Sequence, residues 1–249
     1  MERTVFLNGD FMPESEARIP IFDRGLLFAD SVYEGFGILD SQITDFEYHM
    51  NRLDRSLGEL NMPSPMTRDD LLSAMMKLIA ANDAKEGFLY LQITRGNGDR
   101  SYLYDDSYTP NIFAFTQGEK FKADSNPDPV ALATVPDIRW ARRDIKTTNL
   151  LGQVMAKQAA HLAGAQEALM IAPDGDITEA GSSSFFQPDF SRRGPWGFRF
   201  DRSNRFAEEG RWTSLRSGLA SGGCLPGQIL RDQPRNDRFL CGWSKGSSS

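Results

Sequence analysis

A polar segment at residues 118–129 separates two stretches of strand and helix patterns, and this separation restricts the chain to a fold in two parts. The segment holds two prolines, which interrupt both helices and sheets. With 249 residues the chain is long enough to bury a core in each part. We therefore predict an N-terminal domain over residues 1–120 and the start of a second domain over residues 121–187.

The first part has the local signals of an α+β domain. An Asn-Gly pair at Asn8-Gly9 favours a two-residue hairpin turn, and Thr67 followed by Asp70 favours a capped helix start. Apolar residues at helical spacing predict a helix over residues 46–60. The predicted elements are hairpins with turns at residues 8–10 and 40–41, helices over 46–60 and 67–82, and strands over 88–94 and 111–116.

The second part begins with a similar alternation. A strand over residues 130–135 precedes a helix over 148–162, which ends at Gly164. A hairpin follows, with strands over 167–172 and 176–178 around a Pro-Asp-Gly turn. The predicted fold class is therefore α+β, a mixed α/β architecture with two domains.

The composition changes after residue 187. Residues 188–249 contain 11 Lys and Arg against 6 Asp and Glu, whereas residues 1–187 contain 17 against 28. Three of the four Trp and both Cys also lie there, but the segment has no Val or Tyr, so it offers little material for strands. We interpret it as an atypical tail, either a disordered or divergent extension or an out-of-frame translation. Because disordered segments are poor in aromatic residues, we favour the frameshift.

The overall composition excludes several classes of function. No apolar run approaches the ~20 residues of a membrane helix, and the N-terminus lacks a signal-peptide pattern, so a cytoplasmic location is expected. A net charge of -6 argues against nucleic acid as a partner. The cysteines Cys224 and Cys241 and the histidines His49 and His161 lack metal-ligand spacing, so we expect no metal site.

Two short segments contain candidate residues for catalysis and cofactor binding. Lys146 lies at a strand-to-helix junction, and Glu179 ends a later hairpin, just before a loop of small residues. A lysine that forms a Schiff base and a carboxylate that pairs with a pyridinium nitrogen are what pyridoxal phosphate chemistry needs. The nearby Arg139, Arg142 and Arg143 would lower the pKa of Lys146 and favour its neutral amine. Taken alone, each of the two residues is also consistent with an ordinary charged side chain at the solvent-exposed surface.

The segments together resemble the fold-type IV (class IV) pyridoxal-phosphate aminotransferases, in particular the D-amino-acid transaminase branch. The resemblance covers residues 6–186 and stops there. It is carried by Asp23-Arg24-Gly25, Ser31-Val32-Tyr33-Glu34-Gly35, His49-Met50-Asn51-Arg52-Leu53, Thr94-Arg95-Gly96, residues 144–164 and Thr178-Glu179-Ala180-Gly181-Ser182-Ser183-Ser184.

The resemblance implies a role for each matched residue. Lys146 would be the catalytic residue and hold pyridoxal 5'-phosphate, and Arg52 would bind the phosphate of the cofactor. Glu179 would contact its ring nitrogen, and Ser183 and Ser184 would offer further donors, although the family usually has Asn at the position of Ser184. For the substrate, the resemblance assigns the carboxylate to Tyr33, Arg100 and Tyr102, where the family has His in place of Tyr102. It also implies a homodimer.

Several readings of function stay open. The first is transfer of an amino group from a D-amino acid to a 2-oxo acid. Gly35 leans towards the branched-chain enzymes of the same fold, and R-amine transaminases and aminodeoxychorismate lyase share that fold. We find no counterpart of the family's second phosphate-binding turn after residue 186, so an inactive relic with a damaged C-terminus is the remaining alternative.

Overall fold

The computed structural model describes residues 2–118, 130–185 and 238–240. The chain divides into a first unit, Met1–Ala123 with Arg142–Asn149, and a second unit, Asp124–Ala141 with Leu150–Ser249. Nearly all of the predicted linker and all but three residues of the predicted tail lie outside the described ranges. The chain thus enters the second unit, returns to the first for eight residues, and enters the second again. The sequence assigned residues 142–149 to the second domain, whereas they lie in the first unit.

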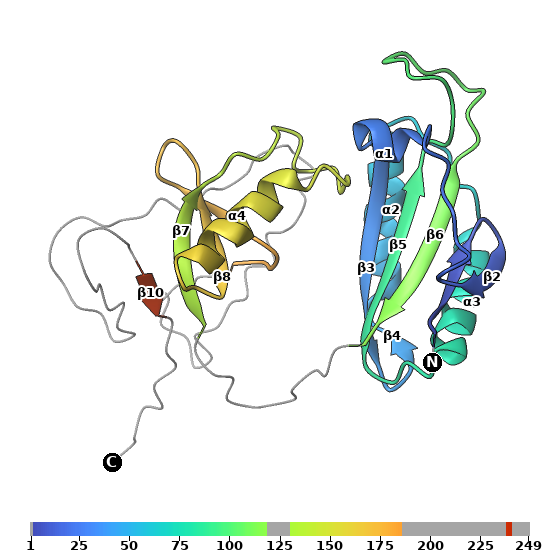
Figure 1. The fold of residues 1–249 in the computed structure, drawn as a ribbon, viewed down its shortest axis with the longest axis horizontal. Helices are drawn as coiled ribbons and strands as arrows, with labels where there is room; N and C mark the ends of the chain where they lie inside the picture. Colours follow the sequence, from blue (N-terminus) through green and yellow to red (C-terminus); the bar gives the residue numbers. More distant parts are fainter. Residues whose placement is uncertain (1, 119–129, 186–237, 241–249) are drawn as a thin grey trace, which may run out of the picture. The chain divides into compact units, whose positions relative to one another are not determined.

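The first unit is built on an antiparallel six-stranded sheet in the order β2-β1-β6-β5-β3-β4 (Figure 1). Its strands are β1 (Thr4–Leu7), β2 (Asp10–Pro13), β3 (Ser31–Leu39), β4 (Gln42–Ile43), β5 (Gly87–Thr94) and β6 (Asn111–Gln117). A short helix α1 (Arg24–Phe28) precedes β3. The long helices α2 (Phe46–Glu59) and α3 (Arg68–Ala81) cover one face of the sheet.

Local signals account for the predicted turns and caps. Asn8 and Gly9 have φ of 51° and 103°, and Asp40 and Ser41 have φ of 50° and 59°, as two-residue hairpin turns with the right twist require. The Thr67 side chain accepts a hydrogen bond from the backbone N–H of Asp70 and caps α3. The two hairpins and the start of this helix are therefore confirmed.

The core of the first unit lies between the helices and the sheet. Alternate residues of β3 point into it, and Val32, Phe36 and Ile38 are fully buried there together with Leu53 of α2 and Leu78 of α3. Because side chains of a strand alternate between faces, Tyr33 and Gly35 lie on the opposite face. β3 therefore presents one set of residues to the helices and another to the outer face of the sheet.

The second unit has a four-stranded sheet in the order β10-β7-β8-β9, with β7 and β8 parallel and the other pairs antiparallel. Its elements are β7 (Ala131–Pro136), α4 (Leu151–Leu162), β8 (Glu167–Ile171), β9 (Ile177–Ala180) and β10 (Arg238–Leu240). α4 connects β7 to β8 and packs on both through small residues, Ala156 and Ala160. β10 is a strand within the predicted tail.

The α4 helix begins three residues later than predicted, at Leu151 rather than at residue 148. The backbone of the preceding residues is used elsewhere, because Thr147 forms an antiparallel bridge with Val32 and the N–H of Thr148 donates to the carbonyl of Ser31. These contacts attach the segment to the edge of β3. Propensity alone does not detect such a long-range pairing.

The fold class is confirmed: both units combine helices with sheets in an α+β arrangement. Within the described ranges, none of the helices combines the length and the apolar character needed to cross a membrane.

Candidate functional site

Lys146 is held by its backbone between β3 and α2. Its carbonyl accepts a hydrogen bond from the N–H of Tyr33 at 3.0 Å, and its own N–H donates to the hydroxyl of Ser56 at 3.2 Å. Ile145, the residue before it, is buried in the core of the first unit. The position of the lysine is therefore fixed from both sides by regular elements.

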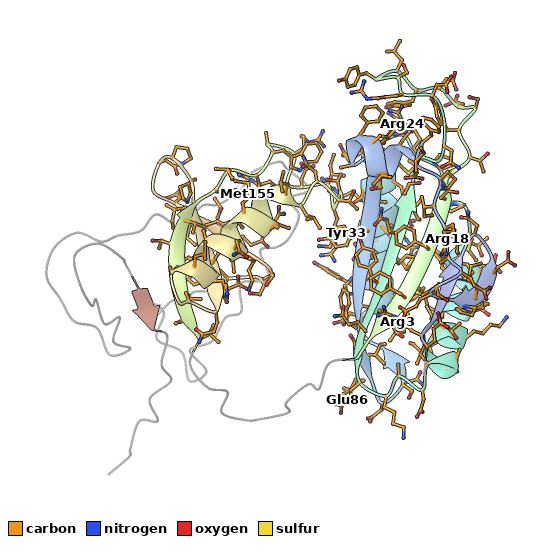
Figure 2. All side chains as sticks on the ribbon, in the orientation of Figure 1. Arg3, Arg18, Arg24, Tyr33, Glu86 and Met155 are labelled. Carbon is orange, nitrogen blue, oxygen red and sulfur yellow. The ribbon has the colours of Figure 1, made fainter. Side chains whose placement is uncertain are left out.

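The Lys146 side chain lies against the phenol of Tyr33, which Figure 2 labels on β3. Its amine, Nζ, donates to the Tyr33 hydroxyl at 3.2 Å and lies 4.5 Å from the centre of the ring. Tyr33 in turn stacks on Tyr90 of β5, with ring centres 5.5 Å apart. Burial raises the pKa of the Tyr90 phenol. A primary amine beside a phenol, in a half-buried place, suits nucleophilic attack on a carbonyl carbon.

Arg52 reaches the same strand from the helix side. Its Nε and Nη2 donate to the two oxygens of Glu34 at 2.7 and 2.6 Å, and His49 Nδ1 lies 2.8 Å from the second oxygen. The Glu34 side chain is fully buried. Burial raises the pKa of this carboxyl, but the hydrogen bonds and charge of Arg52 and His49 outweigh burial and hold the pKa below its ordinary value.

Glu34, the partner of Arg52, is a further functional candidate, which lies in a segment that carries the family resemblance. Glu34 lies on the core-facing side of β3, in register with Val32 and Phe36, and a charge in that position needs a partner. His49 and Arg52 are three residues apart and therefore share one side of α2. The charged residue among the core-facing positions of β3, together with the spacing of His49 and Arg52, was the signal in the sequence that could have indicated this contact. An arginine fixed in this way presents a planar, charged donor that suits a phosphate group.

Glu179 lies on β9 in the second unit. Its carboxylate accepts a hydrogen bond from Arg139 Nη1 at 2.7 Å, and Arg139 is also bound to Asp137 through Nε and Nη2 at 3.0 and 2.9 Å. The Thr178 hydroxyl donates to Asp137 at 2.6 Å. Burial raises the pKa of Asp137, but these hydrogen bonds outweigh it and lower the pKa to about 2. The buried carboxylate of Asp137 thus fixes Arg139, and Arg139 in turn orients Glu179.

The hydrogen bonds of Asp137 with Arg139 and Thr178 lead to a prediction about stability. We expect Asp137→Asn to lower the free energy of unfolding of the second unit by about 1.5–3 kcal/mol at pH 7, because the hydrogen bonds of Arg139 lose their charged partner. The depressed pKa means that this stabilisation is complete above the ordinary value of 3.8 and is lost as the pH falls towards about 2. Urea unfolding followed by hydrogen exchange of β8 and β9 measures the difference.

The matched control is Asp174→Asn, in the exposed turn between β8 and β9. Its effect should stay below about 0.5 kcal/mol at every pH. A difference between wild type and Asp137→Asn that persists unchanged at pH 2 would contradict the assignment.

The loop after β9 carries the predicted serines. The hydroxyls of Ser182 and Ser183 donate to Glu167 at 2.7 and 3.2 Å, and Lys157 of α4 lies 3.1 Å from the same carboxylate. Ser184 is exposed on the loop. Glu167 therefore organises the loop, a role that the sequence did not reveal because its partners lie ten or more residues away.

Arg100 and Tyr102 lie in the loop between β5 and β6, residues 95–110. Arg100 Nη2 donates to the Tyr102 hydroxyl at 3.3 Å, and both side chains pack against Phe28 of α1. The Tyr102 side chain is exposed. Across the part of the chain that the structure describes, no contact connects this pair with Tyr33, the third predicted substrate residue.

The predicted residues fall into two groups. Lys146, Tyr33, Arg52 and the Arg100–Tyr102 pair belong to the first unit, and Glu179, Ser183 and Ser184 to the second. Of the three cations expected near Lys146, Arg139 lies in the second unit on Asp137 and Glu179, and Arg142 is bound to Asp144 at 2.9 Å. Each unit thus holds its own ordered set of polar side chains.

Comparison with known proteins gives a consistent result. The family model described as amino-transferase class IV matches residues 31–192. The chain is 37% identical over 182 residues to a D-alanine aminotransferase of Bacillus licheniformis, and 34% identical over 183 residues to one of Staphylococcus haemolyticus. Each alignment covers 73% of this chain and 64% of the relative, so the chain spans under two thirds of the length of these proteins.

Solved structures show the same fold. The branched-chain aminotransferase of Escherichia coli superposes with a TM-score of 0.64 at 20% identity, over 73% of this chain and 63% of that one. The enzyme of Thermoproteus uzoniensis with norvaline gives 0.62 at 23% identity, with the same coverage. Another branched-chain aminotransferase, solved with pyridoxamine 5'-phosphate, gives 0.65 at 19% identity, again over 73% and 63%.

Proposed function

This chain belongs to the class IV aminotransferases, and from that premise we propose that it transfers the amino group of a D-amino acid, such as D-alanine, to a 2-oxo acid, with pyridoxal 5'-phosphate as cofactor. The observation that carries the proposal is the Lys146 amine, which lies 3.2 Å from the Tyr33 hydroxyl on a backbone fixed from both sides. The relatives named D-alanine aminotransferase, at 34–37% identity, support the choice of substrate.

The side chains that each unit offers suit this cofactor chemically. Lys146 offers a primary amine for its carbonyl carbon, and Arg52 offers a guanidinium of fixed plane for its phosphate. Glu179 offers a carboxylate, oriented by Arg139, for its ring nitrogen. Ser183 and Ser184 lie on the following loop, where Ser183 donates its hydroxyl to Glu167. When bound, the cofactor supplies an electron sink for the substrate.

The chain's own residues would perform the remaining work. Lys146 Nζ, as a free amine, takes the proton from the α-carbon of the substrate, and the Tyr33 hydroxyl orients that amine. Glu34 holds the guanidinium of Arg52 in one plane. Tyr33, Arg100 and Tyr102 bind the substrate carboxylate, and the Tyr102 phenol replaces a histidine as a hydrogen-bond donor. We propose that two copies of the chain form the working unit.

A second substrate class is suggested by the sequence run Tyr33-Glu34-Gly35. Gly35 faces Phe88 so closely that a Cβ added there would lie 2.4 Å from the ring, so the strand beside Tyr33 needs a residue without a side chain. The Tyr-Glu-Gly run is typical of the branched-chain enzymes of this fold, which would act on L-leucine. R-amine transaminases and aminodeoxychorismate lyase, which share the fold, are further alternatives.

The test incubates the purified chain with pyridoxal 5'-phosphate, 2-oxoglutarate and one amino donor, and measures the glutamate formed. We expect D-alanine to be the better donor by at least about tenfold over L-alanine and L-leucine, since a carboxylate held on one side of the site admits one enantiomer. Faster turnover of L-leucine would replace the proposal with the branched-chain alternative. Lack of turnover with every donor, together with lack of cofactor binding, would identify an inactive relic.

A further inference from the structure

Two buried arginines lie where α1 meets the loop between β5 and β6. Arg24 and Arg95 are 3% and 4% exposed, and each donates from Nε to the same oxygen of Asp30 at 2.8 Å. Figure 2 labels Arg24 at this end of the sheet. A buried guanidinium is costly unless all sides of it are satisfied. One shared carboxylate is insufficient for two such groups, so the surrounding atoms must supply the rest.

The loop of residues 95–110 supplies that compensation. Arg24 Nη1 donates to the carbonyl of Ser101 at 2.6 Å and lies 3.5 Å from that of Leu103. The Arg95 guanidinium lies 3.7 Å from the centre of the Tyr104 ring, and Arg24 lies 5.7 Å from the same ring. Tyr104 therefore faces both cations, an attraction that grows when the cations are desolvated.

The base of the loop is also closed. Gly96 has φ of +106°, and a Cβ added there would lie 1.9 Å from the carbonyl oxygen of Thr109. Arg95 joins the loop to the end of α2, since its Nη2 and Nη1 donate to the carbonyls of Leu60 and Asn61 at 2.7 and 3.2 Å. The loop thus has a rigid base and a second attachment at Arg24, near its tip.

The contacts of Arg24 with the loop lie on either side of Tyr102, one of the proposed substrate residues. Ser101 and Leu103, whose carbonyls face Arg24, are the two neighbours of Tyr102, and Arg100 comes directly before Ser101. The backbone is therefore fixed on both sides of Tyr102, while the Arg100 and Tyr102 side chains stay outside the buried cluster and contact each other.

We propose that Arg24 is a positioning residue for substrate selection: by holding the carbonyls on both sides of Tyr102, it sets the place of the Arg100–Tyr102 pair that binds the substrate carboxylate. The inference rests on the proposed function for the role of that pair. Arg24 itself contacts no substrate. Its fork shape is required, because one donor must reach Asp30 while another reaches Ser101.

The test compares Arg24→Lys with wild type on two donors that differ only at the carboxyl group, D-alanine and D-alaninamide. Lysine keeps the positive charge but cannot span the two acceptors. We expect KM for D-alanine to rise about tenfold or more with kcat changed less than about threefold, because small displacements of binding groups weaken binding strongly. The values for D-alaninamide should change less than about twofold.

A second readout follows the loop directly and needs no turnover. Chymotrypsin cleavage after Tyr102 and Tyr104, measured by mass spectrometry without cofactor, should be faster in Arg24→Lys. Tyr104→Leu is used if Arg24→Lys does not fold. It removes the aromatic ring, leaves both buried guanidinium groups paired with Asp30, and should raise KM for D-alanine and the rate of cleavage after Tyr102. Arg18→Lys, the same change at an exposed arginine, is the matched control and should equal wild type.

Arg100→Ala separates the inference from the function on which it rests. If Arg100→Ala weakens D-alanine selectively, and Arg24→Lys adds no further loss in that background, the two residues act as a unit and the inference holds. If Arg100→Ala is selective but Arg24→Lys affects both donors equally or leaves cleavage unchanged, the inference is overturned and the proposed function stands. Equal effects of Arg100→Ala on both donors would overturn the role of the pair, and the inference with it.

Discussion

Lys146→Ala is expected to reduce kcat for transamination by at least about 10³-fold, because the change removes both the nucleophile and the group that moves the α-proton. The visible absorption band that forms when wild type is mixed with pyridoxal 5'-phosphate should be absent. Folding should be unaffected, since the contacts that fix this residue come from its backbone N–H and carbonyl. The measurements are steady-state rates, absorbance spectra and far-UV circular dichroism.

Lys77→Ala provides the control for this experiment. Lys77 is exposed on α3, and alanine is a good helix former there, so rate and spectrum should match those of wild type. A Lys146→Ala protein that folds and keeps the visible band would remove Lys146 from the proposed role. A folded wild type that never forms the band would point instead to the inactive alternative.

Arg52→Ala is expected to have the largest effect on stability. The change leaves Glu34, which is fully buried, without the guanidinium that binds both of its oxygens and with His49 as the remaining partner. Removing one partner of a buried ion pair costs about 3–5 kcal/mol, because the remaining charge stays desolvated. Hydrogen exchange of β3 and β5 amides in urea at pH 7.5 measures the free energy of unfolding of the first unit.

The pH dependence should reverse in this variant. In wild type the pKa of Glu34 lies below its ordinary value of 4.5, so its stabilisation is present above that value and is lost as the pH falls through the lowered pKa. Without Arg52, burial raises the pKa, and protonation of Glu34 at lower pH then removes the cost of the buried charge. The difference in stability between the two proteins should therefore narrow from pH 7.5 to pH 4.5.

Arg68→Ala is the matched arginine control. Arg68 also binds two carboxylates, those of Glu47 and Asp54, but it lies at the surface. Exposed ion pairs contribute about 0–1 kcal/mol, so this variant should be nearly as stable as wild type at both pH values. Equal losses from Arg52→Ala and Arg68→Ala would contradict the importance given to burial of Glu34.

The sequence predicted the turns and the helix cap, because residues close together in the chain determine these features. The turns at Asn8-Gly9 and Asp40-Ser41 need positive φ at both positions, and the cap at Thr67 needs one side-chain acceptor. These requirements are met within a few residues, so each could be found without the fold. The residues Lys146 and Tyr33 were singled out through resemblance, and the structure places the amine of one at the phenol of the other.

Pairings across long sequence distances could not be predicted in this way. The start of α4 depends on Thr148 bonding to Ser31, 117 residues away. The support for Arg52 depends on a carboxylate in a neighbouring strand, and the support for Ser182 depends on Glu167 at the far end of the same hairpin, 15 residues away. Such contacts are decided by the register of the sheets, and a single sequence gives only the alternation of each strand.

The return of residues 142–149 to the edge of β3 has a consequence for biosynthesis. The N–H of Tyr33 and the carbonyl of Ser31 gain their partners only when Lys146 and Thr148 have left the ribosome. Until then the first unit carries an unpaired strand edge, a site at which nascent chains associate with one another. Completion of the first unit therefore waits until the chain has passed through β7, so synthesis of the second unit begins before the first unit is complete.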